Sequence, residues 1–231
     1  MPKTLTEVRK AVARYVQDAD KNLLEEDFNA AIDEAAFVLS KRNPRLVFEE
    51  KTGDGAVFEW ALATATFIIG LSKIKNVYWP WEDDDTFDPL PPLQSEAYLL
   101  YEKTADVWYL KSRGFTPSST EVIRIQYTSK HVVSDTVANC TIQNPQWEND
   151  VSKLAASFCL QMLSARSVAV GNPNYNADTV NYQSRSGEYA RRAKELLEMS
   201  GLKAYVETSM ARGGAVFMSM GKTNDPTKEL I

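Results

Sequence analysis

The chain has 231 residues, of which 44% are hydrophobic and 10% aromatic, so it can bury the core of one domain or of a domain that carries an insertion. Its formal net charge of -5 excludes the broad basic field of a protein that grips nucleic acid. No apolar run approaches membrane-spanning length, and the charged first residues predict no cleavable signal peptide. We therefore expect a globular protein without a membrane, made and used in a cytoplasm or in an assembly formed there.

Two helices are predicted at the start of the chain. Thr4 and Glu7 have the spacing of a capping box, and apolar residues recur behind them at helical intervals. A second helix is predicted to begin near Asn22, with Glu25 three positions later, and to stop at Pro44. The two should form a helical hairpin.

From about residue 45 the hydrophobic period changes to that of strands. Segments 45–50 and 56–62 flank Gly-Asp-Gly at 53–55, which predicts a tight hairpin between them. Further segments rich in β-branched and aromatic residues are separated by turn-rich pieces; these are residues 72–80, 97–103, 106–112 and 121–129. We predict an antiparallel β domain over residues 45–143.

The helical pattern returns at Asn144, which has the side chain of an N-cap and precedes Pro145 at the first helical position. Its apolar face includes Phe158, which we expect in the core. A last long helix is predicted over residues 182–207. Its candidate contact residues are basic: Arg185, Arg191, Arg192 and Lys194.

These elements predict an α+β fold with four parts. One helical domain, formed by residues 1–44 and 144–211, is interrupted by the β domain of residues 45–143, and residues 212–231 follow as an extended arm. The arm is predicted to be disordered in the free chain and to become ordered on a partner. Its anchor should be a short apolar cluster, Val216, Phe217, Met218 and Met220.

No catalytic, cofactor or metal site is predicted. His131 follows a strand without a nucleophile elbow or a Cys-His signature, so a polar loop histidine is favoured over a catalytic base. Cys140 and Cys159 form no disulfide framework and are expected to be buried thiols. A carboxylate cluster could hold a hard cation but lacks EF-hand spacing, which favours a solvated loop. Its members are Asp83, Asp84, Asp85 and Asp88.

Aromatic residues are dense in the predicted β domain. They could stack on the bases of a single strand, but such platforms normally line a basic groove, and the loop between two of these strands is acidic. We therefore favour core and interface positions, where each ring buries a large area. The residues are Trp60, Tyr78, Trp79, Trp81, Tyr98, Tyr101, Trp108 and Tyr109.

In the order of these elements the sequence resembles the head-to-tail connector, or adaptor, proteins of tailed bacteriophages. The helical hairpin, the Gly-Asp-Gly hairpin, the strand ending in Tyr-Thr-Ser-Lys-His and the paired terminal helices carry the resemblance. It covers most of the chain apart from residues 80–95 and the arm. The matching segments are residues 8–18, 30–62, 121–133, 150–170 and 176–202.

The resemblance implies a structural virion protein without catalysis. Such proteins form a ring, commonly of twelve copies, in the neck between the portal protein and the tail or next neck protein. The helical part docks on the portal, the terminal segment reaches into it, and the insertion faces the tail. Genome DNA passes through without sequence-specific binding, which suits a chain with no basic tract.

The resemblance also implies functions for the predicted surfaces. The basic residues of the last helix would meet an acidic portal surface or a neighbouring subunit, or form an ordinary solvated face with i, i+4 pairs such as Arg191 to Glu195 and Lys194 to Glu198. The carboxylates from Asp83 to Asp88 would line the lumen or contact the tail. Two other functions stay open: a tail-completion or minor tail component, and, remotely, a metal-dependent hydrolase using these carboxylates with His131.

Overall fold

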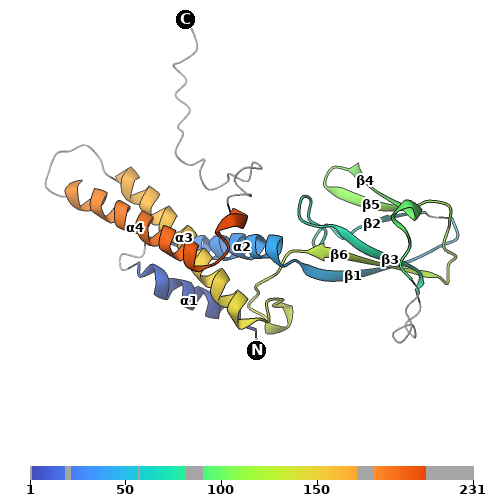
Figure 1. Ribbon diagram of the computed structural model, residues 1–231, viewed down its shortest axis with the longest axis horizontal. Coiled ribbons are helices and arrows are strands. Elements are labelled where there is room, and N and C mark those ends of the chain that lie inside the picture. Colours follow the sequence, from blue (N-terminus) through green and yellow to red (C-terminus); the bar gives the residue numbers. More distant parts are fainter. Residues whose placement is uncertain (1, 19–21, 57, 82–90, 171–178, 207–231) are drawn as a thin grey trace, which may run out of the picture. The chain divides into compact units, whose positions relative to one another are not determined.

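The fold is α+β, in the predicted order of helices, strands and helices. The computed structural model describes residues 2–18, 22–56, 58–81, 91–170 and 179–206 (Figure 1). Two compact units divide the chain. One contains Leu39–Gln143 with Met1–Thr4 and is called the β unit; the other contains Leu5–Val38 with the chain from Asn144 and is called the helical unit.

The elements follow one another in the order α1, α2, β1 to β6, α3, α4. The helices are α1 (Leu5–Val16), α2 (Glu25–Arg42), α3 (Pro145–Val170) and α4 (Thr179–Met199). The strands are β1 (Arg45–Thr52), β2 (Glu59–Ala61), β3 (Ile74–Trp81), β4 (Tyr98–Thr104), β5 (Val107–Ser112) and β6 (Val122–Ser129). In the described ranges no helix combines the length and apolarity needed to cross a bilayer.

The helical unit is organised around α3. Helix α4 packs along it closely because small residues lie at the contact: Ser157 Oγ donates to the Ala193 carbonyl at 2.8 Å, and Ser164 Oγ donates to the Ser186 carbonyl at 3.1 Å. Helix α1 also contacts α3. The expected core position of Phe158 is confirmed, since its exposed fraction is 8%.

The ends of the helices confirm one predicted cap and correct two boundaries. Asn144 Oδ1 accepts the Gln146 N–H at 2.9 Å, as an N-cap does. Helix α2 begins at Glu25 rather than near Asn22, because the Asp27 carboxylate accepts the Leu24 N–H at 2.8 Å. Helix α4 ends at Met199, before residue 207, because Gly201 takes a left-handed φ of 67° that stops the helix.

The β unit contains two antiparallel sheets of three strands each. Sheet A has the order β1-β6-β3, and sheet B has the order β2-β5-β4. Residues of both sheets share one core, in which the Phe67 ring lies 6.2 Å from Trp108 and 5.4 Å from Tyr127. The sheets therefore form two layers (Figure 1). The buried residues of the shared core are Trp60, Leu62, Phe67, Val77, Leu110, Ile123, Ile125 and Tyr127.

The predicted hairpin around Gly-Asp-Gly is wrong. Strand β1 pairs with β6, from Arg45 opposite Ser129 to Thr52 opposite Val122, whereas β2 pairs with β5 in the other sheet. The glycines bond to the loop before β6 instead: the Gly53 N–H donates to the Glu121 carbonyl, and the Gly55 N–H donates to the Pro117 carbonyl, both at 2.9 Å. Gly53 and Gly55 therefore allow the chain both to change direction and to pass close to the loop before β6.

Candidate interaction surfaces

The exposed face of α4 is mixed in charge rather than basic. Arg185, Arg191 and Lys194 are exposed, and so are the carboxylates of Glu188, Glu195 and Glu198. These three cations and three anions balance. The predicted i, i+4 ion pair of Arg191 with Glu195 is formed, and both side chains are more than half exposed, so solvent screens it.

Glu198 pairs with Lys203 at 3.6 Å instead of with Lys194. The ammonium group of Lys194 is left on the exposed side of the helix.

Arg192 has a role inside the helical unit. Its guanidinium donates to the Tyr15 carbonyl at 2.7 Å, close to the C-terminal end of α1, where helix carbonyls lack intrahelical partners. A cation is favourable there because the helix dipole leaves partial negative charge at this end. The structure therefore explains Arg192 as a contact that fixes α4 to α1.

Two predicted sets lie outside the described residues. They are the carboxylates Asp83, Asp84, Asp85 and Asp88 and the apolar cluster Val216, Phe217, Met218 and Met220.

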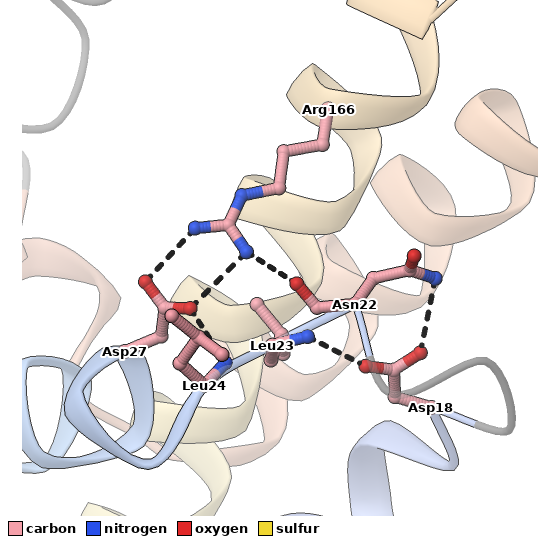
Figure 2. A network of polar contacts seen from close by, with 6 residues as sticks. All are labelled: Asp18, Asn22, Leu23, Leu24, Asp27 and Arg166. Carbon is pink, nitrogen blue, oxygen red and sulfur yellow. Dashed lines mark hydrogen bonds and ion pairs between the residues drawn. The ribbon is translucent and has the colours of Figure 1, made fainter.

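A polar network joins α3 to the connection between α1 and α2 (Figure 2). The Arg166 guanidinium donates to both carboxylate oxygens of Asp27, at 2.9 and 3.1 Å, and to the Asn22 carbonyl. On the same connection, the Asp18 carboxylate accepts the Leu23 N–H at 2.9 Å. The network holds one helix against a turn more than a hundred positions earlier, which no local pattern in the sequence could indicate.

The electrostatics of this network favour a charged carboxylate. Burial disfavours the charge of Asp27, but the N–H of Leu24 and the guanidinium of Arg166 outweigh it, so the pKa of Asp27 lies below its usual value. A two-pronged arginine–carboxylate contact also fixes geometry, because two parallel hydrogen bonds allow one orientation. The network therefore acts as a positioning contact within the helical unit.

His131 lies in a loop, as predicted, and is buried there. It is 4% exposed, its Nε2 lies 2.9 Å from the Asn43 carbonyl, and its Nδ1 lies 3.1 Å from Thr141 Oγ1. Its backbone N–H donates to Ser40 Oγ at 2.8 Å. A neutral ring satisfies these partners with Nε2 as the donor. Burial lowers the pKa of His131, and the nearby charge of Arg45 lowers it further.

This burial predicts a pH dependence of stability. Below about pH 6.5, the usual histidine pKa, the unfolded chain takes up a proton before the folded chain does, so the free energy of unfolding falls as the pH drops towards the folded-state pKa. Urea unfolding at pH 7.5 and 5.5 should show this loss. Because His131 is the chain's one histidine, the loss in this pH interval should shrink in His131→Gln. An equal loss in both proteins would contradict the assignment.

The two thiols are buried as predicted. Cys140 and Cys159 are free and buried, and burial raises the pKa of Cys159 to about 12. Among the described residues, no group of three or more His, Cys, Asp or Glu side chains is arranged to hold a metal ion.

The outer surface of sheet A carries an aromatic and arginine cluster. The Arg124 guanidinium lies 4.4 Å from the centre of the Phe48 ring and 4.3 Å from that of Trp81, which is cation–π geometry on two sides. Glu50 lies 3.7 Å from Arg124. We call this surface face A. Its members are Leu46, Phe48, Glu50, Tyr78, Trp81 and Arg124.

Strand alternation and one irregularity build face A. On β1 every second residue points outward, which leaves Leu46 50% and Phe48 49% exposed. Tyr78 and Trp81 are three positions apart and would normally point to opposite sides. The pairing of β3 with β6 shifts in register between these two residues, and the centres of their rings lie 5.7 Å apart.

The outer surface of sheet B is also aromatic but carries lysines. Glu59 lies 2.7 Å from Lys103 and 3.3 Å from Lys111. The ammonium of Lys103 lies 5.3 Å from the ring centre of Tyr109. We call this surface face B. Its members are Phe58, Glu59, Leu99, Tyr101, Lys103, Tyr109 and Lys111.

Glu59 is held in its charged form. The hydrogen bond from Lys103, followed by those from Tyr101 and Lys111, lowers the pKa of Glu59 to about 2. The same contact raises the pKa of Lys103. Face B therefore presents the ammonium groups of Lys103 and Lys111 around the Glu59 carboxylate, which is charged at neutral pH.

The aromatic residues singled out in the sequence divide between the core and these faces. Trp60 is buried, and Trp79, Tyr98 and Trp108 pack against the core. Tyr78 and Trp81 belong to face A, and Tyr101 and Tyr109 to face B. Sequence reasoning missed Phe48, Phe58 and Arg124. The alternation of residues 45–52 signals an outward position for Phe48, but nothing local indicates its contact with Arg124.

Comparison with known proteins identifies no family. No family model matches the sequence. Among curated proteins, the chain is similar to the tyrosine-protein kinase JAK1 of Danio rerio, with 23% identity over 100 residues. The match covers 43% of this chain and 8% of the kinase, so the chain spans a small part of that relative's length. We therefore assign no activity to the chain from this similarity.

Proposed function

We propose that the chain is a structural head-to-tail connector of a tailed bacteriophage. In this proposal it forms a ring in the neck of the virion, joins the portal protein to the tail or the next neck protein, and surrounds the path of the DNA without catalysing a reaction. Its partners are the portal protein, a tail or neck protein and further copies of itself.

The architecture carries the proposal. The helical unit combines chain from before and after the strands, and the strands of the β unit all lie between α2 and α3 in the sequence. The order of helices, strands and helices is part of the resemblance to connector proteins, whereas the hairpin at Gly-Asp-Gly, another part of it, is not formed.

The distribution of charge agrees with a DNA conduit. The exposed cations of α4 are balanced by carboxylates, and the lysines of face B surround Glu59. Each unbalanced cation facing the lumen would add a salt-dependent attraction to phosphate. The described surfaces present no concentrated basic patch of that kind.

Fractionation of phage mutants tests the proposal. DNA-filled heads are purified from a mutant that makes no tails, free tails are purified from a mutant that makes no heads, and both are probed for this chain and for the portal protein. We expect the chain on the heads, in a fixed ratio to the portal. Recovery of the chain on free tails and its absence from heads would contradict the connector proposal and favour a tail-completion or minor tail component.

A further inference from the structure

The β unit exposes two different aromatic faces that point away from each other. The inner sides of sheets A and B share the core that contains Ile125 and Leu110, so face A and face B lie on opposite sides of one compact unit. On face A, Leu46 and Phe48 are about half exposed; on face B, Phe58 and Leu99 are 42% and 39% exposed. Clusters of exposed apolar side chains of this kind mark interaction sites.

We propose that face A of one copy docks on face B of the next copy. The inference rests on the proposed ring and names the surfaces that close it. A contact between two different patches is heterologous, and repeating it produces a closed ring or an open filament. Aromatic residues and arginine, which dominate face A, are enriched at the centres of protein interfaces.

Charge disfavours the pairing of two copies of face B, whereas face A, which carries Glu50 and Arg124, is neutral. Face B contains Lys103 and Lys111 with one carboxylate, Glu59, so two copies of face B would bring lysines together. Face A offers the Glu50 carboxylate, which is 48% exposed, to the Lys103 ammonium, which is 54% exposed. Opposite charges across an interface fix register and exclude wrong pairings.

A second copy fits face B better than a nucleic acid does. A single strand would place phosphates near the lysines and bases on the tyrosines. The position between the two lysines is occupied by the Glu59 carboxylate, whose low pKa keeps it charged at neutral pH. A phosphate there would meet a negative charge, whereas a protein surface can supply apolar side chains to the rings.

The size of the faces indicates a weak single contact. The three strands of sheet A have eight residues each and cover roughly 15 by 25 Å, or about 400 Å², which is about half of what each partner buries in a stable pair. Sheet B is smaller, because its strands have three, seven and six residues. We therefore expect a monomer in dilute solution. The ring forms when an assembled template places many copies side by side and raises their local concentration.

Cysteine cross-linking on purified heads tests the docking. Leu46→Cys places a thiol on face A and Leu99→Cys places one on face B, while the native Cys140 and Cys159 are buried. With a short bis-maleimide, the double variant should give a ladder of covalent oligomers in denaturing gels. Either single variant should give monomers, because its thiol faces a surface without one.

Three outcomes would overturn the inference. Dimers from one single variant would show that like faces pair. If the double variant is present on heads but forms no ladder, other surfaces close the ring, and the connector proposal stands. If the chain is absent from heads, the connector proposal fails and this inference fails with it.

Two matched measurements complete the test. Phe48→Glu should keep the wild-type melting temperature but reduce the amount recovered on heads at least tenfold, whereas Val137→Glu, at a valine that is 43% exposed in the β unit and outside both faces, should change neither. Equal recovery of Phe48→Glu and wild type would contradict the proposal. Salt-sensitive binding of a fluorescent single-stranded oligonucleotide that disappears when Lys103 and Lys111 are changed to alanine would assign face B to nucleic acid instead.

Discussion

Phe158→Ala should lower the free energy of unfolding of the helical unit by about 3 to 5 kcal/mol, the usual cost of truncating a buried phenylalanine. The side chain lies on α3 and is 8% exposed, so its removal loses apolar burial and leaves a cavity. The matched control is Phe48→Ala on face A, where the ring is 49% exposed. That change should cost less than about 1 kcal/mol, as surface substitutions usually do.

Urea unfolding followed by circular dichroism measures both variants. The chain has two compact units, so each transition is fitted separately, since one two-state curve need not describe both. Equal midpoints for the Phe158 and Phe48 variants would show that this part of α3 does not form the core.

Gly53→Ala is expected to destabilise the β unit by about 1 to 3 kcal/mol, the range for forcing an extra carbon into a filled space. A Cβ atom at this position would lie 2.4 Å from the carbonyl oxygens of Pro117 and Ser118. Both are backbone atoms, so neither can move aside without shifting the loop. The loop leads into β6, the central strand of sheet A.

Gly187→Ala provides a control of opposite sign. Gly187 lies within α4, and a Cβ there meets nothing within 4 Å. Alanine is favoured over glycine in a helix by about 0.5 to 1 kcal/mol, so this variant should unfold at a higher urea concentration. A thermal scan of both variants measures these changes in stability as well. If Gly53→Ala melts with the wild type, the close approach between the two loops is not a feature of the protein.

The sequence predicted the elements better than their pairing. Helical periodicity and the caps are local properties, so the N-cap at Asn144 and the core position of Phe158 could be found from neighbouring residues. Strand pairing joins residues far apart in the chain: Thr52 lies opposite Val122. The Gly-Asp-Gly signal predicts a turn correctly but cannot specify which strand the chain meets after it.

The exposed surfaces also depend on contacts that a local sequence pattern cannot predict. Periodicity places Phe48 on the outside of a strand, but face A also requires Trp81 to point to the side of Tyr78, which depends on an irregularity in β3. Pro80 between them is a signal, because proline within a strand is typical of edges and bulges. On α4, the four basic residues looked equivalent in the sequence. The contact of Arg192 with Tyr15, which lies on another helix, distinguishes it.

An electron cryo-microscopy map of the phage neck tests the central claim most directly. We expect a ring of this chain between the portal and the tail, with the helical unit on the portal and face A of each copy against face B of its neighbour. A neck map of sufficient resolution to trace side chains, with a ring beneath the portal formed by a different fold and no density for this one, would contradict it.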